Sequence, residues 1–85
     1  AATAERATRH EARARWALLS PRERDTCRLF AKGFGVKQIA AELVIHDSTA
    51  QAHRARGMQK LGLETVGELI ELLRAMGEER GAGGG

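Results

Sequence analysis

Residues 47–62, DSTAQAHRARGMQKLG, form the segment around which the rest of the chain is arranged. We expect a single helix here, because Asp47 or Ser48 can accept hydrogen bonds from its first backbone N–H groups and Gly62 can adopt the left-handed conformation that ends a helix. A helix advances about 100° per residue, so the small and apolar positions of the stretch gather on one side. These positions are Ala50, His53, Gly57 and Leu61.

The opposite side of this helix is polar and carries no acid after Asp47. It consists of Ser48, Gln51, Ala52, Ala55 and Gln59, with Arg56 at its edge and Arg54 and Lys60 flanking it. An α-helix fits the major groove of DNA, and Gln and Arg side chains make paired hydrogen bonds to base edges. The pattern predicts a helix that packs by its small side and presents its polar side to DNA. The alternative is an ordinary surface helix with a polar outer side.

A shorter helix is predicted just before, over residues 36–43. Its apolar face is Ile39, Ala40 and Leu43, with Val36 before them, and its outward side is Lys37, Gln38, Ala41 and Glu42. Residues 44–46 are too few for anything but a turn, so the two helices form a helix-turn-helix unit. In that unit the second helix reads the groove and the first crosses the DNA backbone, which makes Lys37 a candidate phosphate contact.

Two more helices are marked by capping boxes, Ser20 with Glu23 and Thr65 with Glu68. The first helix runs to about Lys32, and its predicted buried side is Thr26, Cys27, Leu29, Phe30 and Ala31. The second runs to about Met76, and its apolar stripe is Val66, Leu69, Ile70 and Leu73. Since no segment alternates with the period of two that strands show, we predict an all-α fold.

The ends of the chain differ from its middle. Residues 3–17 are rich in Ala, Arg and Glu, which favours a helix. Either this helix docks its last turn through Trp16 and Leu18, or it is a frayed arm. We divide the chain into a linker helix (1–18), a helix-turn-helix domain (19–76) and a disordered tail (77–85). Leu72 and Met76 are left beside the apolar stripe of the last helix. Either they complete the core or, as we expect, they form a weak homodimer interface.

Composition bounds the possible functions. The 85 residues allow one small domain, with a net charge of +3 and a pI of about 9.8. A single cysteine excludes an internal disulfide and a cysteine zinc site. We find no catalytic acid–base pair, nucleophile motif or phosphate-cradling loop, and we expect no enzyme activity, metal or cofactor.

No apolar run approaches the ~20 residues of a membrane span, and no signal peptide is visible, so we expect a cytoplasmic protein. The start at Ala1, without methionine, suggests a fragment of a longer protein.

Four pieces of sequence together resemble the LuxR-type helix-turn-helix domain. They are LSPRERDTCRLFAKG at 19–33, KQIAAEL at 37–43, T-x-x-x-H-R at 49–54 and M-x-K-L at 58–61. The arrangement is most similar to the FixJ/NarL group of response regulators. The resemblance implies a four-helix, sequence-specific DNA-binding output domain of a bacterial transcriptional regulator. In that group the domain usually follows a phosphorylatable receiver domain.

The resemblance also suggests which residues contact double-stranded DNA. Those expected to face bases are Gln51, Ala52, Ala55 and Arg56, and those expected to hold phosphates are Lys37, Thr49, Arg54 and Lys60. Ser48 and Gln59 complete the outward side of the recognition helix.

Five positions depart from the family pattern. The family usually has Asn at Val36, Ser at His46, Val at Ala50, Lys at Gln51 and a bulky aliphatic residue at Gly57. Gln51 removes a charge that the family aims at DNA, which keeps open a protein-interaction module with weakened or lost DNA binding. His46 suggests a cap moved to Asp47 or Ser48. Gly57 costs ~1 kcal/mol relative to alanine in a helix, so we expect a larger side chain there to stabilise the domain.

Overall fold

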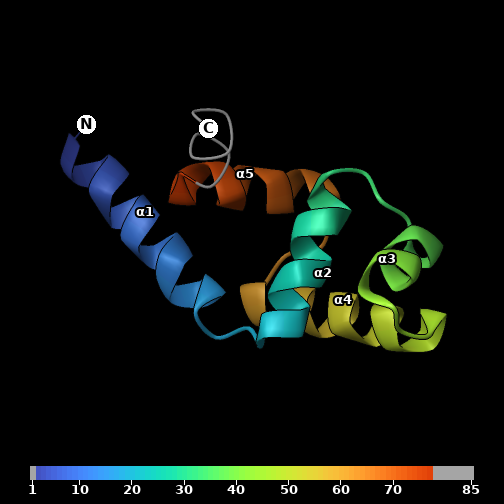
Figure 1. The fold of residues 1–85 in the computed structure, drawn as a ribbon. Helices are drawn as coiled ribbons and strands as arrows, with labels where there is room; N and C mark the ends of the chain where they lie inside the picture. The colour runs from blue at the N-terminus through green and yellow to red at the C-terminus, as the bar shows by residue number, and fades with distance from the viewer. Residues whose placement is uncertain (1, 78–85) are drawn as a thin grey trace.

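Five α-helices make up the part of the chain that the structure describes (Figure 1). The structure is a computed structural model that describes the backbone of residues 2–77 and the side chains of residues 8–77. The helices are α1 (Ala2–Trp16), α2 (Pro21–Ala31), α3 (Val36–Leu43), α4 (Asp47–Leu61) and α5 (Val66–Met76). Residues 2–77 contain no strand, which confirms the predicted all-α fold. The tail predicted to be disordered lies, beyond Gly77, outside the described residues.

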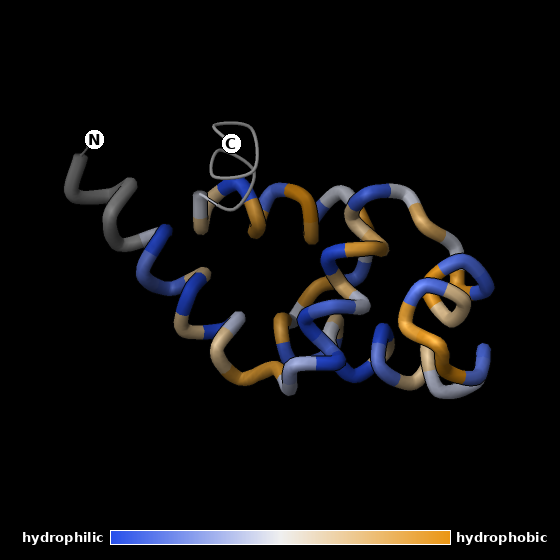
Figure 2. Tube along the Cα trace, in the orientation of Figure 1, coloured by the Kyte–Doolittle hydropathy of each residue, from blue (hydrophilic) through white to orange (hydrophobic). Residues whose placement is uncertain are grey.

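The central element is α2, which packs against α3, α4 and α5, while α1 lies along α5. Two clusters of buried side chains hold these helices together. The larger consists of Ala12, Trp16, Leu19, Cys27, Leu61, Leu69, Leu72, Leu73 and Met76. The smaller consists of Ile39, Ala40 and Ala50 and joins α3 to α4. Figure 2 shows more hydrophobic residues along α5 than along the described part of α1, as expected for a helix that supplies much of the core.

Both predicted capping boxes are confirmed. The backbone N–H of Glu23 donates to Ser20 Oγ at 3.2 Å, and the backbone N–H of Ser20 donates to Glu23 Oε1 at 2.9 Å. Thr65 and Glu68 exchange the same pair of bonds at 3.2 and 3.0 Å. Reciprocal bonds of this kind satisfy backbone donors that a helix start leaves without a partner, so these sequences fix where α2 and α5 begin.

The predicted cap of α4 is wrong. The cap is His46, whose side chain makes no capping hydrogen bond, and the helix begins at Asp47. The cause lies in the preceding turn, where Val44 takes a left-handed conformation with φ of 56° and the backbone N–H of Ile45 donates to Ala40 at 2.9 Å. This tight reversal places the backbone of His46 at the start of α4. Asp47 therefore lies in the first turn, where its negative charge interacts favourably with the helix dipole and stabilises the helix.

The described end of α1 is docked on the domain, but not as predicted in every detail. Trp16 is buried with 8% of its surface exposed, whereas Leu18, the second expected anchor, is 64% exposed. Leu19 takes the buried place instead at 3%. Residues two apart in a helical turn point to nearly opposite sides, whereas residues three apart share one side. The chain continues after Trp16 as a turn in which the backbone N–H of Leu19 donates to Trp16 at 3.1 Å, so Leu19 rather than Leu18 shares the buried side.

The docked α1 also covers the surface that we expected to be exposed on α5. Leu72 and Met76 are 9% and 6% exposed, and they share a core cluster with Ala12 and Trp16. Arg13 adds a hydrogen bond from its guanidinium to the backbone oxygen of Met76 at 3.2 Å. The expectation that these two α5 side chains remain exposed is therefore wrong, because apolar side chains of α1 cover them.

Gly57 is buried where α4 crosses α2. A Cβ atom on this glycine would lie 2.6 Å from Sγ of Cys27 and 3.6 Å from a methyl carbon of Leu19. The expectation that a larger residue here stabilises the domain is wrong. The thiol of Cys27 fills the volume that an aliphatic side chain at this position would need.

Candidate nucleic-acid interface

The pairing of α3 with α4 rests on three buried side chains, one isoleucine and two alanines. Ile39 and Ala50 are 0% exposed and Ala40 is 3% exposed. Alanines at the contact let two helix backbones approach closely, and half-buried Phe34, Leu43 and Ile45 close the sides of this cluster. The predicted inward side of α4 is confirmed along its length, because Gly57 and Leu61 are buried as well.

The predicted outward side of α4 faces solvent. Its exposed members are Ser48, Gln51, Ala55, Arg56 and Gln59. Thr49 and Ala52 are half-buried at its margins. Lys37 is exposed in the first turn of α3, which is the helix that packs beside α4. The structure thus leaves amide, hydroxyl and guanidinium groups on one accessible helix surface, with Asp47 as its one acid.

Arg54 is held against the core rather than extended into solvent. Its guanidinium lies 5.1 Å from the centroid of the Phe30 ring, and the residue is half-buried. A guanidinium stacked on an aromatic ring is attracted to the ring face and keeps its in-plane N–H donors for other partners. Arg54 therefore has a fixed position beside the outward side, where its in-plane donors could bond to two oxygens of one acceptor, such as a phosphate.

Lys60 has a partner that sequence reasoning missed. Its Nζ lies 2.7 Å from Oε1 of Glu23, a carboxylate whose side chain is only 6% exposed, whereas the Lys60 side chain is 41% exposed. The hydrogen bond from Lys60, followed by the backbone N–H of Ser20, lowers the pKa of Glu23 from its ordinary value of 4.5. Lys60 thus ties the end of α4 to the start of α2.

His53 is half-buried, and its Nδ1 is buried without a hydrogen-bond partner. No group of three His, Cys, Asp or Glu side chains within residues 8–77 is placed to hold a metal ion. Burial raises the pKa of the Cys27 thiol to about 11, so this cysteine stays protonated at neutral pH.

Val44 is the other residue that the sequence did not single out. It is 88% exposed in the turn between α3 and α4, and it is the one non-glycine residue with a positive φ among those described. A β-branched side chain is disfavoured in this conformation, so the turn carries local strain. Nothing in the local sequence marks this, because the strain follows from how tightly the two helices are joined.

Comparison with known proteins identifies the architecture. Residues 17–73 match the family of bacterial regulatory proteins called the luxR family. The chain is 44% identical over 54 residues to the oxygen regulatory protein NreC of Staphylococcus aureus (strain JH9), an alignment that covers 64% of this chain and 25% of NreC. It also resembles the crystal structure of full-length FixJ from B. japonicum, with a TM-score of 0.82 and 34% identity over 91% of this chain and 38% of that one.

The predicted family is therefore confirmed, and the chain spans a quarter of NreC and 38% of FixJ. Within residues 2–77, no helix is long and apolar enough to cross a membrane. The match includes the whole of α2, α3 and α4 and most of α5, so the helix-turn-helix described above is the part that is shared. The chain belongs to the luxR family of bacterial regulatory proteins and carries the helix-turn-helix DNA-binding domain of that family.

Proposed function

We propose that this domain is the DNA-binding output of a cytoplasmic response regulator, and that α4 reads sequence in the major groove. The observation that carries the proposal is the exposed surface of α4, where Gln51 and Arg56 stand on a helix held rigidly by buried alanines. Rigid placement matters because base-edge hydrogen bonds need fixed geometry. The domain needs no cofactor and performs no chemistry.

Base recognition falls to the middle of α4. Gln51 and Arg56 can each form paired hydrogen bonds, to adenine and to guanine respectively. Ala52 and Ala55 offer methyl groups for contact with thymine, and Ser48 and Gln59 extend the surface toward both helix ends.

Phosphate contacts hold this surface in place. Arg54 has the best geometry, since Phe30 fixes its guanidinium. Lys37 and Thr49 lie near the start of α3 and α4, where the DNA backbone passes in this motif. Lys60 contributes less to DNA than a free lysine would, because Glu23 offsets its charge.

The wider assembly is part of the same proposal. A receiver domain would precede residues 1–18, which act as the linker to the DNA-binding domain at 19–76. Two copies would occupy half-sites about one helical turn apart. An interface through Leu72 and Met76 would require α1 to leave α5, since α1 covers both side chains here.

The test is selection of binding sites from a randomised duplex library, followed by titration of Arg56→Ala on the selected site. Loss of a paired contact to guanine should weaken binding by about 1–3 kcal/mol and relax the preference at one base pair. Arg74→Ala is the matched control, because Arg74 is exposed on α5, which packs on α1 and α2. If the two variants weaken binding equally and leave the base preference unchanged, α4 does not read the bases.

A further inference from the structure

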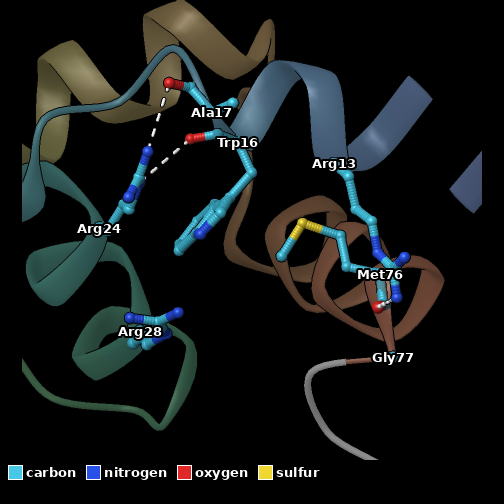
Figure 3. Close-up of a pocket in the computed structure, with 7 residues that line it drawn as sticks. All are labelled: Arg13, Trp16, Ala17, Arg24, Arg28, Met76 and Gly77. Atoms are coloured by element: carbon cyan, nitrogen blue, oxygen red, sulfur yellow. Dashed lines mark hydrogen bonds between the residues drawn. The ribbon is translucent and has the colours of Figure 1, made fainter. Parts of the chain in front are cut away.

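Arg28 and Arg54 both lie over aromatic rings, but in different parts of the domain. The Arg28 guanidinium lies 5.3 Å from the centroid of the Trp16 ring, at the cleft between α2 and the ends of α1 and α5 (Figure 3). No residue of α4 lines that cleft, so this contact serves the docking of α1. The Arg54 guanidinium lies 5.1 Å from the centroid of the Phe30 ring and joins α4 to α2. This second contact places an arginine beside the outward side of α4.

Phe30 lies where the two buried clusters meet. It is the last residue but one of α2, it is half-buried, and it packs against both the larger and the smaller cluster. Side chains in a close-packed core have little room to turn. The ring therefore gives the guanidinium above it a support that is fixed by the core of the domain.

Arg54 lies at the margin between this core and solvent. It follows the fully buried Ala50 by one helical turn, so its side chain begins beside the contact between α3 and α4. Ala55, the next residue, is exposed on the outward side, and Arg54 itself is half-buried. The proposed function needs a phosphate contact at this margin, beside the residues that face the bases.

A fixed guanidinium binds a phosphate more tightly than a mobile one. Immobilising a long side chain on binding lowers affinity by about twofold to tenfold, because rotamer freedom is lost. Contact with the ring has already restricted the Arg54 side chain in the free domain. The same contact engages the face of the guanidinium and leaves the direction of its in-plane N–H donors open toward a phosphate.

We propose that Phe30 is a positioning residue for DNA binding, which acts on the DNA only through Arg54. The inference rests on the proposed function, because it takes Arg54 as a phosphate contact. The ring changes the freedom of the guanidinium and leaves its charge unchanged, and the charge determines how many counterions the DNA releases. Loss of the ring therefore weakens binding and leaves its salt dependence unchanged, whereas loss of Arg54 reduces both.

The first test needs no DNA. NMR relaxation of the Nε–H group measures the order parameter of each arginine side chain in the free domain, and Arg56 is the internal control because it is exposed on the same helix. We expect a higher order parameter for Arg54 than for Arg56, and a fall to the Arg56 value in Phe30→Leu. Equal order parameters in the unmodified domain would overturn the proposal, since the ring would then leave the guanidinium mobile.

A double-mutant cycle then measures binding to a duplex selected from the randomised library. Phe30→Leu should weaken binding about twofold to tenfold with an unchanged salt slope, and Phe30→Tyr, which keeps the ring, should restore the affinity. In an Arg54→Ala background, Phe30→Leu should cause no further loss. Phe34→Leu is the matched control, because it makes the same change at the other phenylalanine of the chain, which also packs against the smaller cluster. Any loss that it causes should be equal with and without Arg54.

The outcomes separate this proposal from the proposed function. If Phe30→Leu weakens binding by the same factor with and without Arg54, Phe30 acts through the fold alone, and the positioning role is overturned while DNA recognition by α4 stands. A domain that binds no duplex overturns the proposed function and the positioning role together, even where the Arg54 guanidinium is rigid.

Discussion

The two halves of α4 pack against different helices. The first half packs on α3 through Ala50 and leaves Gln51 and Ala55 exposed. The second half packs on α2 through Gly57, and Lys60 binds a buried carboxylate there. The comparison teaches that one helix can separate binding from stability along its length. Changes to the buried contacts of the second half should destabilise the domain, whereas changes to exposed residues on the outward side of α4 should alter DNA binding alone.

The largest expected effect on stability comes from Gly57→Ala. Its methyl group would meet Cys27 Sγ at 2.6 Å, and overpacking of this kind costs about 1–3 kcal/mol. Gly67→Ala is the matched control, because its Cβ would meet only Thr65 Oγ1 at 3.8 Å and alanine should gain about 0.5–1 kcal/mol in a helix. Urea unfolding measures both variants.

The same experiment identifies the cause. Cys27→Ala removes the sulfur that the new methyl group would strike, so the double variant should lose less stability than the two single losses added together. Additive losses would mean that the backbone around Gly57, rather than the thiol, resists a side chain.

A smaller loss is expected for Lys60→Ala. The change leaves the buried Glu23 carboxylate without its charged partner, and we expect a cost of about 1–2 kcal/mol, because the lysine end of the pair is partly exposed. The pKa of Glu23 is lowered in the folded state, so its stabilisation is present above the ordinary value of 4.5 and is lost as pH falls through the lowered pKa.

The free energy of unfolding of the unmodified domain should therefore fall as pH drops below 4.5. The fall should be shallower in Lys60→Ala, where the first cause of the lowered pKa is gone. Glu68 also has a lowered pKa, from backbone hydrogen bonds, and provides a common background in both proteins. Equal pH dependence in the two proteins would show that the Glu23–Lys60 pair is not formed in solution.

The smallest expected change is a gain, in the turn that joins α3 to α4. Val44→Asn should raise the free energy of unfolding by about 1 kcal/mol, because asparagine tolerates the left-handed conformation better than a β-branched residue. Thermal unfolding measures the gain, and DNA affinity should not change. A lower unfolding midpoint would mean that the exposed valine makes contacts that outweigh its backbone strain.

What the sequence predicted correctly was local. Three local features were predicted correctly: the capping boxes at Ser20 and Thr65 and the end of α4 at Gly62. Each depends only on residues a few positions apart, so it can be predicted without knowing the tertiary structure. Helical spacing alone also indicated the outward side of α4. The assignment of this side to DNA stays a prediction.

What the sequence did not reveal depends on contacts between distant residues. Glu23 and Lys60 are 37 positions apart, and each alone looks like a solvated charge. The collision of a side chain at Gly57 with Cys27 follows from how closely α2 and α4 approach. Likewise, α1 covers Met76 because of its docking angle, which its own composition does not determine.

The most direct test of DNA recognition by α4 is the salt dependence of binding to a selected duplex. Phosphate contacts release counterions, so the logarithm of the binding constant should fall linearly with the logarithm of salt concentration, with a slope of about 0.9 per contacted phosphate. Arg54→Ala should reduce this slope by about one, and Gln51→Lys should increase it by about one. A slope near zero for the unmodified domain, unchanged in both variants, would contradict the account and favour a protein-interaction module on the same fold.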